Sequence, residues 1–562
     1  MSHNKEVIII GGGVSGLGMA CQLQRLLGHQ EFTIYEKSGS IGGTWNHNQY
    51  PGCACDIPSH FYSYSFAMKP DWTTTYPGRD ELLKYVLSVA DRYDINRRTR
   101  LYSELISAKW NSEGNVWVCK FRDTQTQEIF FREGAALVSA VGTLDKPMIP
   151  KIEGQDSFKG SAFHSARWEH DTNFKNKNVV VLGNGASATQ FITPLTEMVG
   201  PKGSVTQIVR SAHWWIKRGN APYSSFWKAL MRYVPGAAKL YRTYLAYDLD
   251  RTFFSFYMTV NGQRLRDQVA AQTKQYIATT APEEYKKILL PNYEPGCKRR
   301  VNTNNYLETL HKPNMHLSKS HVTSVDNNVV QTAEGERYPA DILVYATGFE
   351  TQDWLFPMHI IGKDGVDLAS HWRALGGAEA YKGTVVNGFP NFFILYGPNA
   401  ATGQHSVIFH SECQINYACR LLRPVLSKGA DSIEVKDVAQ KRDLEWVHGR
   451  MPGLVFNSGC QSWWMNPKTK KNTFIYPDPM VLYWLRTIFP SWSDFTIKGR
   501  QSGFSTGIVT TLSVAFLGTA AWFASNKYSA NGFVGNTAWS YLSGLLEHEQ
   551  VLLKQCSKLL KR

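Results

Sequence analysis

The fold of this chain is set by the stretch Glu6-Val-Ile-Ile-Ile10-Gly11-Gly-Gly13-Val-Ser-Gly16. Its apolar residues are typical of a buried parallel strand, and residues 14–27 have the apolar spacing of a helix. At such a turn the glycines let the backbone approach a pyrophosphate, which binds the free N–H groups at the start of the helix. Glu36 ends the next strand, where a carboxylate accepts hydrogen bonds from a ribose. The stretch therefore predicts a dinucleotide site.

A second glycine-rich turn stands in the middle of the chain, at Gly183-Asn-Gly185-Ala-Ser-Ala188. It has the same setting, with an apolar strand at 178–182 and a helical pattern that runs towards residue 198. Two such units predict an α/β protein with two Rossmann-like domains, in which electrons pass between two cofactors.

The residue after the second strand differs between the two units. Where the first unit has Glu36, the second has Arg210, followed by Ser211 and further cations at Lys217 and Arg218. A cation there attracts a 2′-phosphate, so the second unit predicts NADPH rather than NADH, with a solvated basic loop as the alternative. Because hydride from NADPH needs an acceptor in the same protein, the first unit predicts a flavin.

Composition restricts the classes of function. A chain of 562 residues is expected to form two or three domains. Its net charge of +15 comes from lysines and arginines that are dispersed along the chain, and no motif that reads bases accompanies them. This pattern argues against nucleic-acid binding. The nine cysteines show neither CxxC pairs nor metal-ligand spacing, which favours a reducing compartment and no metal site. Cys53-Ala-Cys55 is interpreted as packing rather than as a redox pair.

The C-terminal end has a different character. Residues 501–526 carry no charge, and 504–524 are long enough to cross a bilayer core. An amphipathic stretch follows and ends in Lys561 and Arg562, which suits an anionic membrane surface. We expect a hydrophobic helix that attaches the protein to a membrane, in single-pass or monotopic form, with the catalytic part facing the cytoplasm. The alternatives are a helical hairpin packed on the protein and a soluble cytoplasmic protein.

Motifs over residues 5–400 occur in the order of a known family. The chain resembles the class B flavoprotein monooxygenases in Gly42-Gly-Thr-Trp45 and in the motif that includes Asp56. It is similar to the Baeyer-Villiger branch, whose fingerprint FxGxxxHxxxW is matched by Phe158, Gly160, His164 and Trp168. In that family the final Trp separates the Baeyer-Villiger branch from the N- and S-oxygenating enzymes.

The resemblance implies which residues hold the two cofactors. For FAD these are Gly11, Gly13, Val14, Ser15, Gly16, Glu36, Lys37, Gly43, Thr44, Trp45, Asp56 and Tyr62. For NADPH they are Gly183, Gly185, Ala186, Ser187, Arg210, Ser211, Lys298, Ala346, Thr347 and Gly348.

The resemblance also implies the catalytic residues. Arg299 would be a fixed cation that keeps a flavin peroxide deprotonated, and Asp56 would pair with Arg299 and orient it. Without the resemblance, Lys298-Arg299-Arg300 would be interpreted as a basic run on the surface.

The implied activity is NADPH-dependent. A C4a-peroxyflavin inserts one oxygen atom of O2 into an apolar ketone, which gives an ester or a lactone. Two alternatives stay open: an N- or S-oxygenating flavin monooxygenase, and a protein that binds FAD and NADPH without catalysis.

The fingerprint also has a physical interpretation. It lies in the link between the two units, so Phe158 and Trp168 are expected to anchor this linker, and His164 to hydrogen-bond across the domain boundary. Direct proton transfer by His164 is the alternative.

Four segments are predicted. They are the first part of the FAD-binding domain at 1–150, the NADPH-binding domain at 151–370 with a helical insertion at 221–296, the second part of the FAD-binding domain at 371–495, and the C-terminal segment at 496–562.

Overall fold

A computed structural model describes residues 5–427, 429–460 and 462–499 of the chain. The predicted hydrophobic helix at 504–524 and the amphipathic tail lie outside these residues. Among the helices that the structure describes, none combines the length and the apolar character needed to cross a bilayer.

The first sheet is parallel and carries the first glycine turn. Its strand order is β19 (Phe392–Ile394), β7 (Ala136–Ser139), β1 (Val7–Ile10), β2 (Phe32–Tyr35) and β3 (Thr99–Arg100). All four residues of β1 are buried, as expected of a central parallel strand that is covered on both faces. Because β19 returns to this sheet from residue 392, the first unit is built from two distant parts of the chain.

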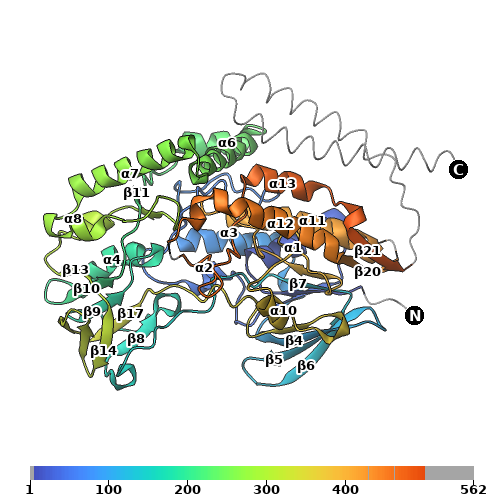
Figure 1. The fold of residues 1–562 in the computed structure, drawn as a ribbon, viewed down its shortest axis with the longest axis horizontal. Helices are drawn as coiled ribbons and strands as arrows, with labels where there is room; N and C mark the ends of the chain where they lie inside the picture. Colours follow the sequence, from blue (N-terminus) through green and yellow to red (C-terminus); the bar gives the residue numbers. More distant parts are fainter. Residues whose placement is uncertain (1–4, 428, 461, 500–562) are drawn as a thin grey trace. The chain divides into compact units, whose positions relative to one another are not determined.

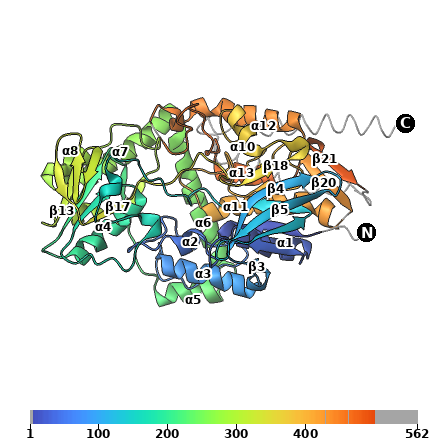
Figure 2. The same cartoon turned by 90° about the horizontal axis from the view of Figure 1, so that it is seen from below.

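Helix α1 (Val14–Leu27) connects β1 to β2 and lies beside α11 (Val407–Ser427) (Figures 1 and 2). Ser15 Oγ and Ser411 Oγ lie 2.8 Å apart between the two helices. Figure 1 shows α12 (Asp437–Arg450) and α13 (Met480–Ile488) on the same side of the molecule as α11.

The second sheet is also parallel and carries the second glycine turn. Its strand order is β13 (Met315–Lys319), β10 (Ser204–Val209), β9 (Asn178–Leu182), β17 (Ile342–Tyr345) and β8 (Ser161–His164). Helix α4 (Ala186–Val199) follows β9, as the sequence predicts.

The fingerprint segment differs from its expected form. It contains β8, the edge strand of the second sheet, in which His164 is opposite Tyr345. The segment is therefore part of the second unit rather than a linker between units. A Cβ at Gly160 would lie 2.0 Å from Asp341 O, so glycine is required where this edge meets the neighbouring loop.

Smaller elements complete the fold. Mixed and antiparallel sheets are formed by β18 (His359–Ile361), β4 (Ser103–Asn111), β5 (Val116–Asp123) and β6 (Ile129–Gly134); by β14 (Val322–Asp326), β15 (Val329–Thr332) and β16 (Arg337–Pro339); and by β20 (Ala430–Val435) and β21 (Phe495–Gly499). A parallel pair joins β11 (Trp215–Lys217) and β12 (Val301–Thr303). Further α-helices outside the segment 221–296 are α2 (Thr44–His47), α3 (Arg79–Arg92), α9 (Tyr306–Thr309) and α10 (Leu368–Ala374).

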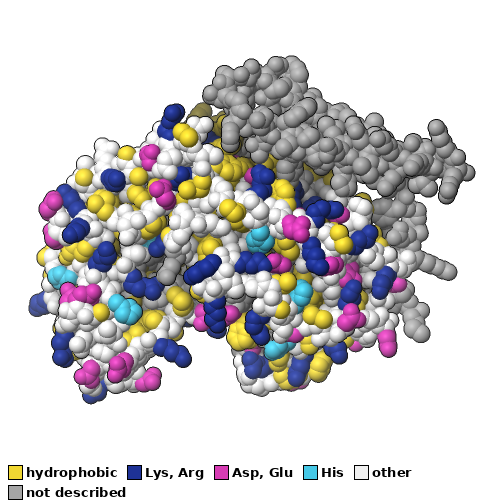
Figure 3. Space-filling model, viewed as in Figure 1, with side chains coloured by type: hydrophobic (Ala, Val, Ile, Leu, Met, Phe, Trp, Pro, Cys, Tyr) yellow, Lys and Arg dark blue, Asp and Glu magenta, His cyan; other side chains and the backbone are white. Residues whose placement is uncertain are grey.

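The predicted helical segment after residue 220 contains α5 (Ser225–Tyr233), α6 (Ala237–Arg251), α7 (Val260–Thr280) and α8 (Glu283–Leu289). These helices are green in Figure 1, where α6 and α7 lie along the upper edge of the described residues. In the space-filling view of the same face, Lys and Arg side chains are scattered and interspersed with Asp and Glu (Figure 3).

The two units pack tightly through α4. Gln190 Nε2 donates to Ala54 O at 3.0 Å, and Tyr50 Oη donates to Gln190 Oε1 at 2.9 Å. A Cβ at Gly52 would lie 2.6 Å from Gln190 O, so only glycine allows this approach. These contacts place the loop that ends at Asp56 at the junction of the units.

Candidate functional site

The first glycine turn is fixed by the carboxylate at the end of β2. Glu36 is buried, and its Oε2 accepts a hydrogen bond from Gly12 N–H at 2.7 Å. Its Oε1 accepts from the backbone N–H and the hydroxyl of Ser38 at 2.9 and 2.7 Å. A Cβ at Gly16 would lie 2.0 Å from Gly11 O. The helix can start this close to the strand only with glycine at that position.

A second backbone segment faces the same turn. A Cβ at Gly43 would lie 2.8 Å from the Cα of Gly13, and Gly43 itself has a φ of 53°. Helix α2 begins directly after it, with Thr44 and the buried Trp45. Trp45 packs edge-on against Tyr62 with ring centroids 5.6 Å apart. The two glycine-bearing segments thus form a narrow cradle around the start of α1.

Three further predicted FAD residues are tied to neighbouring parts of the protein. Val14 O accepts from Tyr64 Oη at 2.5 Å, and Ser15 Oγ contacts Ser411 Oγ. Lys37 forms an exposed ion pair with Asp145. The structure therefore brings all the predicted FAD residues except Asp56 to the ends of β1 and β2 and the loop around α2.

The second turn repeats the backbone of the first. Helix α4 starts at Ala186 after Gly185, with no side-chain cap and no acidic residue in its first turn. Its first N–H groups, including that of Ser187, are available to an anion. A Cβ at Gly185 meets no atom within 4 Å, so space lies above this turn.

The loop after β17 closes the back of the second turn. A Cβ at Gly183 would lie 2.4 Å from Ala346 O. Thr347 Oγ1 donates to Met148 O, and Met148 N–H donates to Gly348 O at 2.9 Å. Ala346 therefore lies against the turn through its backbone, while Thr347 and Gly348 hold the same loop to Met148.

Two positively charged side chains, Arg210 and Lys298, interact beyond the C-terminal end of β10. Lys298 Nζ donates to Ser211 Oγ at 3.5 Å, although the two residues lie far apart in sequence. Burial lowers the pKa of Lys298, and the positive charge of Arg210 lowers it further. Two cations held this close repel each other, and a doubly charged phosphate would relieve that repulsion.

Arg299 and Asp56 form the predicted ion pair. Arg299 Nη2 donates to Asp56 Oδ2 at 2.6 Å, with both side chains about one third exposed. The charge of Asp56 raises the pKa of Arg299 against the effect of burial. Burial acts to raise the pKa of Asp56, but Arg299 and Arg218 together hold it below its ordinary value. Both groups are therefore charged at neutral pH.

Arg218 has a different place from the one its sequence position indicates. It is buried, its Nη1 donates to Cys55 O at 2.5 Å, and its Nε donates to Asn304 Oδ1 at 3.2 Å. It therefore supports the Asp56 loop and does not belong to the cations at Arg210. No sequence signal identifies this role, because the contact joins residues 163 positions apart.

Two uncharged side chains that the sequence did not reveal lie in the electric field of Arg299, and a third polar side chain, that of Gln404, is buried on the same stretch of chain. Burial raises the pKa of Tyr396 to about 12, against the field of Arg299. Burial holds the pKa of His410 well below its ordinary value, with His405 and Arg299 contributing. Gln404 is buried, and neither of its side-chain amide atoms has a hydrogen-bond partner. Tyr396 and Gln404 precede α11 and His410 lies on it, and these residue types show no spacing that could have identified them from the sequence.

The fingerprint residues form a packed edge. Trp168 lies 5.3 Å from Phe191 of α4 and 5.6 Å from Phe174, measured between ring centroids. His164 is buried, its Nδ1 accepts from Ala166 N–H at 3.1 Å, and burial lowers its pKa to about 4. The hydrogen bond at Nδ1 is local, and the backbone of Gly348, which acts to raise the pKa of His164, belongs to the same unit. The expected hydrogen bond across the domain boundary stays a prediction.

The two cysteines of Cys53-Ala-Cys55 are free and buried, and burial raises the pKa of Cys53 to about 11. Thiols that titrate this high are poor nucleophiles, which fits the interpretation as packing.

Comparisons with known proteins bear on this arrangement. The profile of the flavin-binding monooxygenase-like family matches residues 4–224. A Baeyer-Villiger monooxygenase of Streptomyces coelicolor is 34% identical over 475 residues, which cover 84% of this chain and 88% of the relative. A Baeyer-Villiger monooxygenase of Pseudomonas aeruginosa is 32% identical, with 84% and 87% covered. The chain belongs to the Baeyer-Villiger monooxygenase family.

Solved structures share the fold of this Baeyer-Villiger monooxygenase. The structure of OTEMO in complex with FAD and NADP has a TM-score of 0.77 at 23% identity and covers 88% of this chain and 100% of its own. Cyclohexanone monooxygenase in its closed form has a TM-score of 0.77 at 23% identity, with 89% and 100% covered. The expectation of an FAD- and NADPH-dependent monooxygenase is confirmed.

Proposed function

We propose that this Baeyer-Villiger monooxygenase oxygenates an apolar ketone at the junction of its two units, with Arg299 as the catalytic cation and Asp56 as the residue that orients it. The observation that carries the proposal is the Arg299–Asp56 ion pair, because it links a residue after the helical insertion to the loop that packs against α4.

The residues present fit both cofactors. The narrow contact between Gly13 and Gly43 leaves room for backbone but not for side chains, as a pyrophosphate cradle requires. The open space over Gly185 and the paired cations Arg210 and Lys298 suit a second dinucleotide that carries a 2′-phosphate. When bound, FAD takes hydride from NADPH and activates dioxygen.

The chain supplies a fixed charge to this chemistry. Arg299 keeps its proton at any working pH, because Asp56 raises its pKa. A preorganised guanidinium stabilises negative charge as it develops on a reacting oxygen, without reorganisation of solvent. Asp56 holds the guanidinium in one direction, and Arg218 holds the loop of Asp56 through Cys55 O.

The surroundings favour an apolar substrate. His405 packs against Phe61 and Phe409 with ring centroids 4.8 and 5.0 Å apart, and burial lowers its pKa to about 3. The imidazole is therefore neutral, as is that of His410. Arg242 lies over the Phe61 ring, but its charge is compensated by a buried ion pair with Glu412. A ketone without charged groups therefore matches these surroundings better than an ionic substrate does.

The proposal is tested with Arg299→Ala. Ketone oxygenation should fall by about a hundredfold to a thousandfold, because one charge-stabilising donor is lost, while reduction of the flavin by NADPH continues. Arg299→Lys should recover only part of the activity, since an ammonium lacks the planar fork that matches a carboxylate.

The matched control is Arg232→Ala on α5, which breaks an exposed ion pair with Asp71 and should leave turnover unchanged. Unchanged ketone turnover in Arg299→Ala would remove the proposed role. Products from a ketone, a thioether and an amine, measured by mass spectrometry, distinguish insertion of oxygen next to a carbonyl carbon from S- or N-oxygenation.

We also propose membrane attachment through residues 504–524, supported by the absence of charge over 501–526. The full chain should float with lipid vesicles in a density gradient, and Leu512→Arg with Leu517→Arg should abolish flotation. A wild-type chain that stays in the aqueous fractions would contradict attachment.

A further inference from the structure

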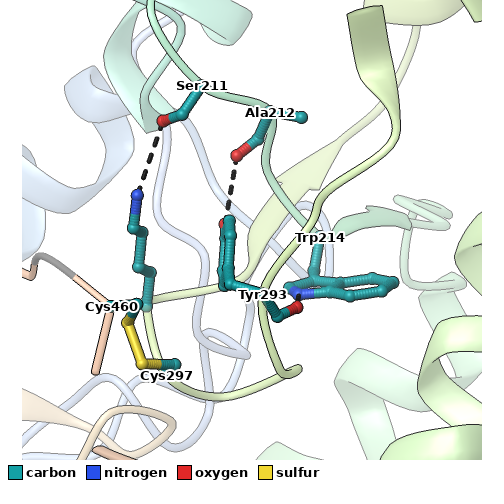
Figure 4. Close-up of a disulfide and its surroundings, with 7 residues drawn as sticks. Ser211, Ala212, Trp214, Tyr293, Cys297 and Cys460 are labelled. Atoms are coloured by element: carbon teal, nitrogen blue, oxygen red, sulfur yellow. Dashed lines mark hydrogen bonds between the residues drawn. A yellow bond between two sulfur atoms is a disulfide. The ribbon is translucent and has the colours of Figure 1, made fainter. Parts of the chain in front are cut away.

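Two of the nine cysteines are joined across the fold. Cys297 and Cys460 form a disulfide between positions 163 residues apart, with a Cα–Cα distance of 6.2 Å. This pair departs from the expectation of a reducing compartment, in which thiols stay unpaired. Figure 4 shows the disulfide near the side chains of Trp214 and Tyr293. The other described cysteines, Cys21, Cys53, Cys55, Cys119, Cys413 and Cys419, are free and buried.

The disulfide adjoins both cations of the site. Cys297 is fully buried and directly precedes Lys298 and Arg299. Its segment, between the end of α8 at Leu289 and the start of β12 at Val301, contains no helix or strand. No backbone ladder fixes the direction of Arg299, so tertiary contacts must do so.

Noncovalent contacts hold two points of this segment. Trp214 Nε1 donates to Tyr293 O at 3.0 Å, and Tyr293 Oη donates to Ala212 O at 3.1 Å (Figure 4). Further along, Arg299 reaches Asp56 on the first unit. Between them stands Cys297, whose only covalent tie outside the main chain is the disulfide.

The other end of the disulfide lies in a packed part of the protein. Trp463, three residues after Cys460, accepts hydrogen bonds at its carbonyl oxygen from Thr351 Oγ1 and Gln352 Nε2 at 2.7 and 2.9 Å. Trp464 is buried against Phe456 with ring centroids 5.3 Å apart. The cross-link therefore ties the segment of Arg299 to a second loop, which is held to the protein at Trp463 and Trp464.

We propose that the Cys297–Cys460 disulfide is a positioning cross-link for Arg299 and Lys298, and that its reduction lowers oxygenation. The proposal rests on the role of Arg299 proposed above. Displacement of a catalytic group by about 1 Å lowers a rate by about a hundredfold, so a covalent tie next to Arg299 has a large effect on turnover.

Reduction needs a dithiol. Its thiolate attacks Cys460 Sγ, because Cys460 is partly exposed while Cys297 is buried. Cys297 leaves as a thiolate and takes up a proton. The second thiol of the reductant then displaces Cys460 as a thiol, so two electrons leave the dithiol, which becomes a disulfide.

The first measurement counts thiols. Enzyme purified without reductant and then unfolded should show two fewer reactive thiols than its nine cysteines, and all nine after treatment with dithiothreitol. A count of nine without reductant would overturn the proposal.

The second measurement separates positioning from folding. In the FAD-loaded enzyme, Cys297→Ser, Cys460→Ser and the double variant should each lower ketone product per NADPH consumed by about tenfold, with flavin content and melting temperature retained. Treatment of the wild type with dithiothreitol should lower the product per NADPH by the same factor. The same treatment of the cysteine variants should cause no further loss of product. Cys419→Ser, a buried free cysteine on α11, is the matched control and should keep both activity and the response to dithiothreitol.

The third measurement shows whether the cross-link acts through Arg299. In an Arg299→Ala background, Cys297→Ser should cause no further loss of product. An equal loss in both backgrounds, or loss of flavin in every cysteine variant, would make the disulfide merely structural and overturn the proposal. Wild-type turnover in Arg299→Ala alone would instead remove the proposed function, so the two failures are distinguishable.

Discussion

The two glycine turns start alike and end differently. Both follow a buried parallel strand, and both open a helix without a side-chain cap or an acid in its first turn. At the end of the next strand, however, Glu36 is buried and bonded to Gly12, whereas Arg210 is exposed and joined by Lys298 from a distant segment. We infer from this comparison that each turn provides a site for an anion, and we propose that the residue after the second strand selects the nucleotide.

The turns also differ in how tightly the protein closes on them. A Cβ at Gly16 would meet Gly11 O at 2.0 Å, and one at Gly43 would meet the first turn at Gly13, whereas a Cβ at Gly185 meets nothing within 4 Å. The backbone at Gly43 thus closes over the turn of the first unit, which suits a cofactor that stays bound. The second turn is closed at its back, where Gly183 meets Ala346 O, but it is open over Gly185, as suits a cofactor that exchanges.

The largest effect should come from a methyl group in the closed turn. Gly16→Ala places a Cβ against backbone that cannot yield, so we expect a loss of about 3 kcal/mol of stability and a chain without flavin. In the open turn, Gly185→Ala should keep flavin content and raise KM for NADPH about tenfold, the equivalent of about 1.4 kcal/mol. Flavin absorbance and thermal melting check both; equal flavin content in the two variants would contradict the distinction between a closed and an open turn.

A smaller effect is expected from a reversal of charge in the second unit. Arg210→Glu should raise KM for NADPH about a hundredfold, because a carboxylate repels the 2′-phosphate, while KM for NADH should stay the same or fall. Lys217→Glu is the matched control, since Lys217 is exposed and pairs with Glu308 on the adjacent surface. An equal rise for both nucleotides would show that Arg210 does not contact the 2′-phosphate.

The smallest effect is on pH dependence. Burial and Arg210 lower the pKa of Lys298 below 10.5, so the free enzyme loses this charge as pH rises through a value lower than that of an ordinary lysine. A plot of kcat/KM for NADPH against pH should therefore fall at alkaline pH, where Lys298 loses its proton. In Arg210→Ala this fall should begin at a higher pH, because the removal of a repelling charge raises the pKa of Lys298. A break that does not move would show that Lys298 is not the group that titrates.

The sequence indicated local features well. The strand–glycine–helix order of both units, the carboxylate at Glu36 and the cation at Arg210 depend on neighbours within about 30 residues, and the structure places each at its strand end. The Arg299–Asp56 pair was expected only through family resemblance, since residues 243 positions apart share no local pattern.

Some assignments failed for a definite physical reason. The fingerprint was expected to be a linker, but pairing of β8 with β17 makes it an edge strand, and a strand's partner is not visible in its own residues. Arg218 stands among basic residues in sequence, yet burial against Cys55 O gives it a role in the Asp56 loop.

The amino-acid sequence by itself determined two nucleotide units, their unequal strand-end charges and the resemblance to Baeyer-Villiger enzymes, because these depend on short spacings and on the chemistry of single side chains. Only the tertiary structure decided that Lys298 meets Ser211, that Gln190 of α4 packs on the Asp56 loop, and that Cys297 is joined to Cys460. Such contacts arise when distant segments are packed together, and the packing of the whole chain, not local spacing, selects which residues meet.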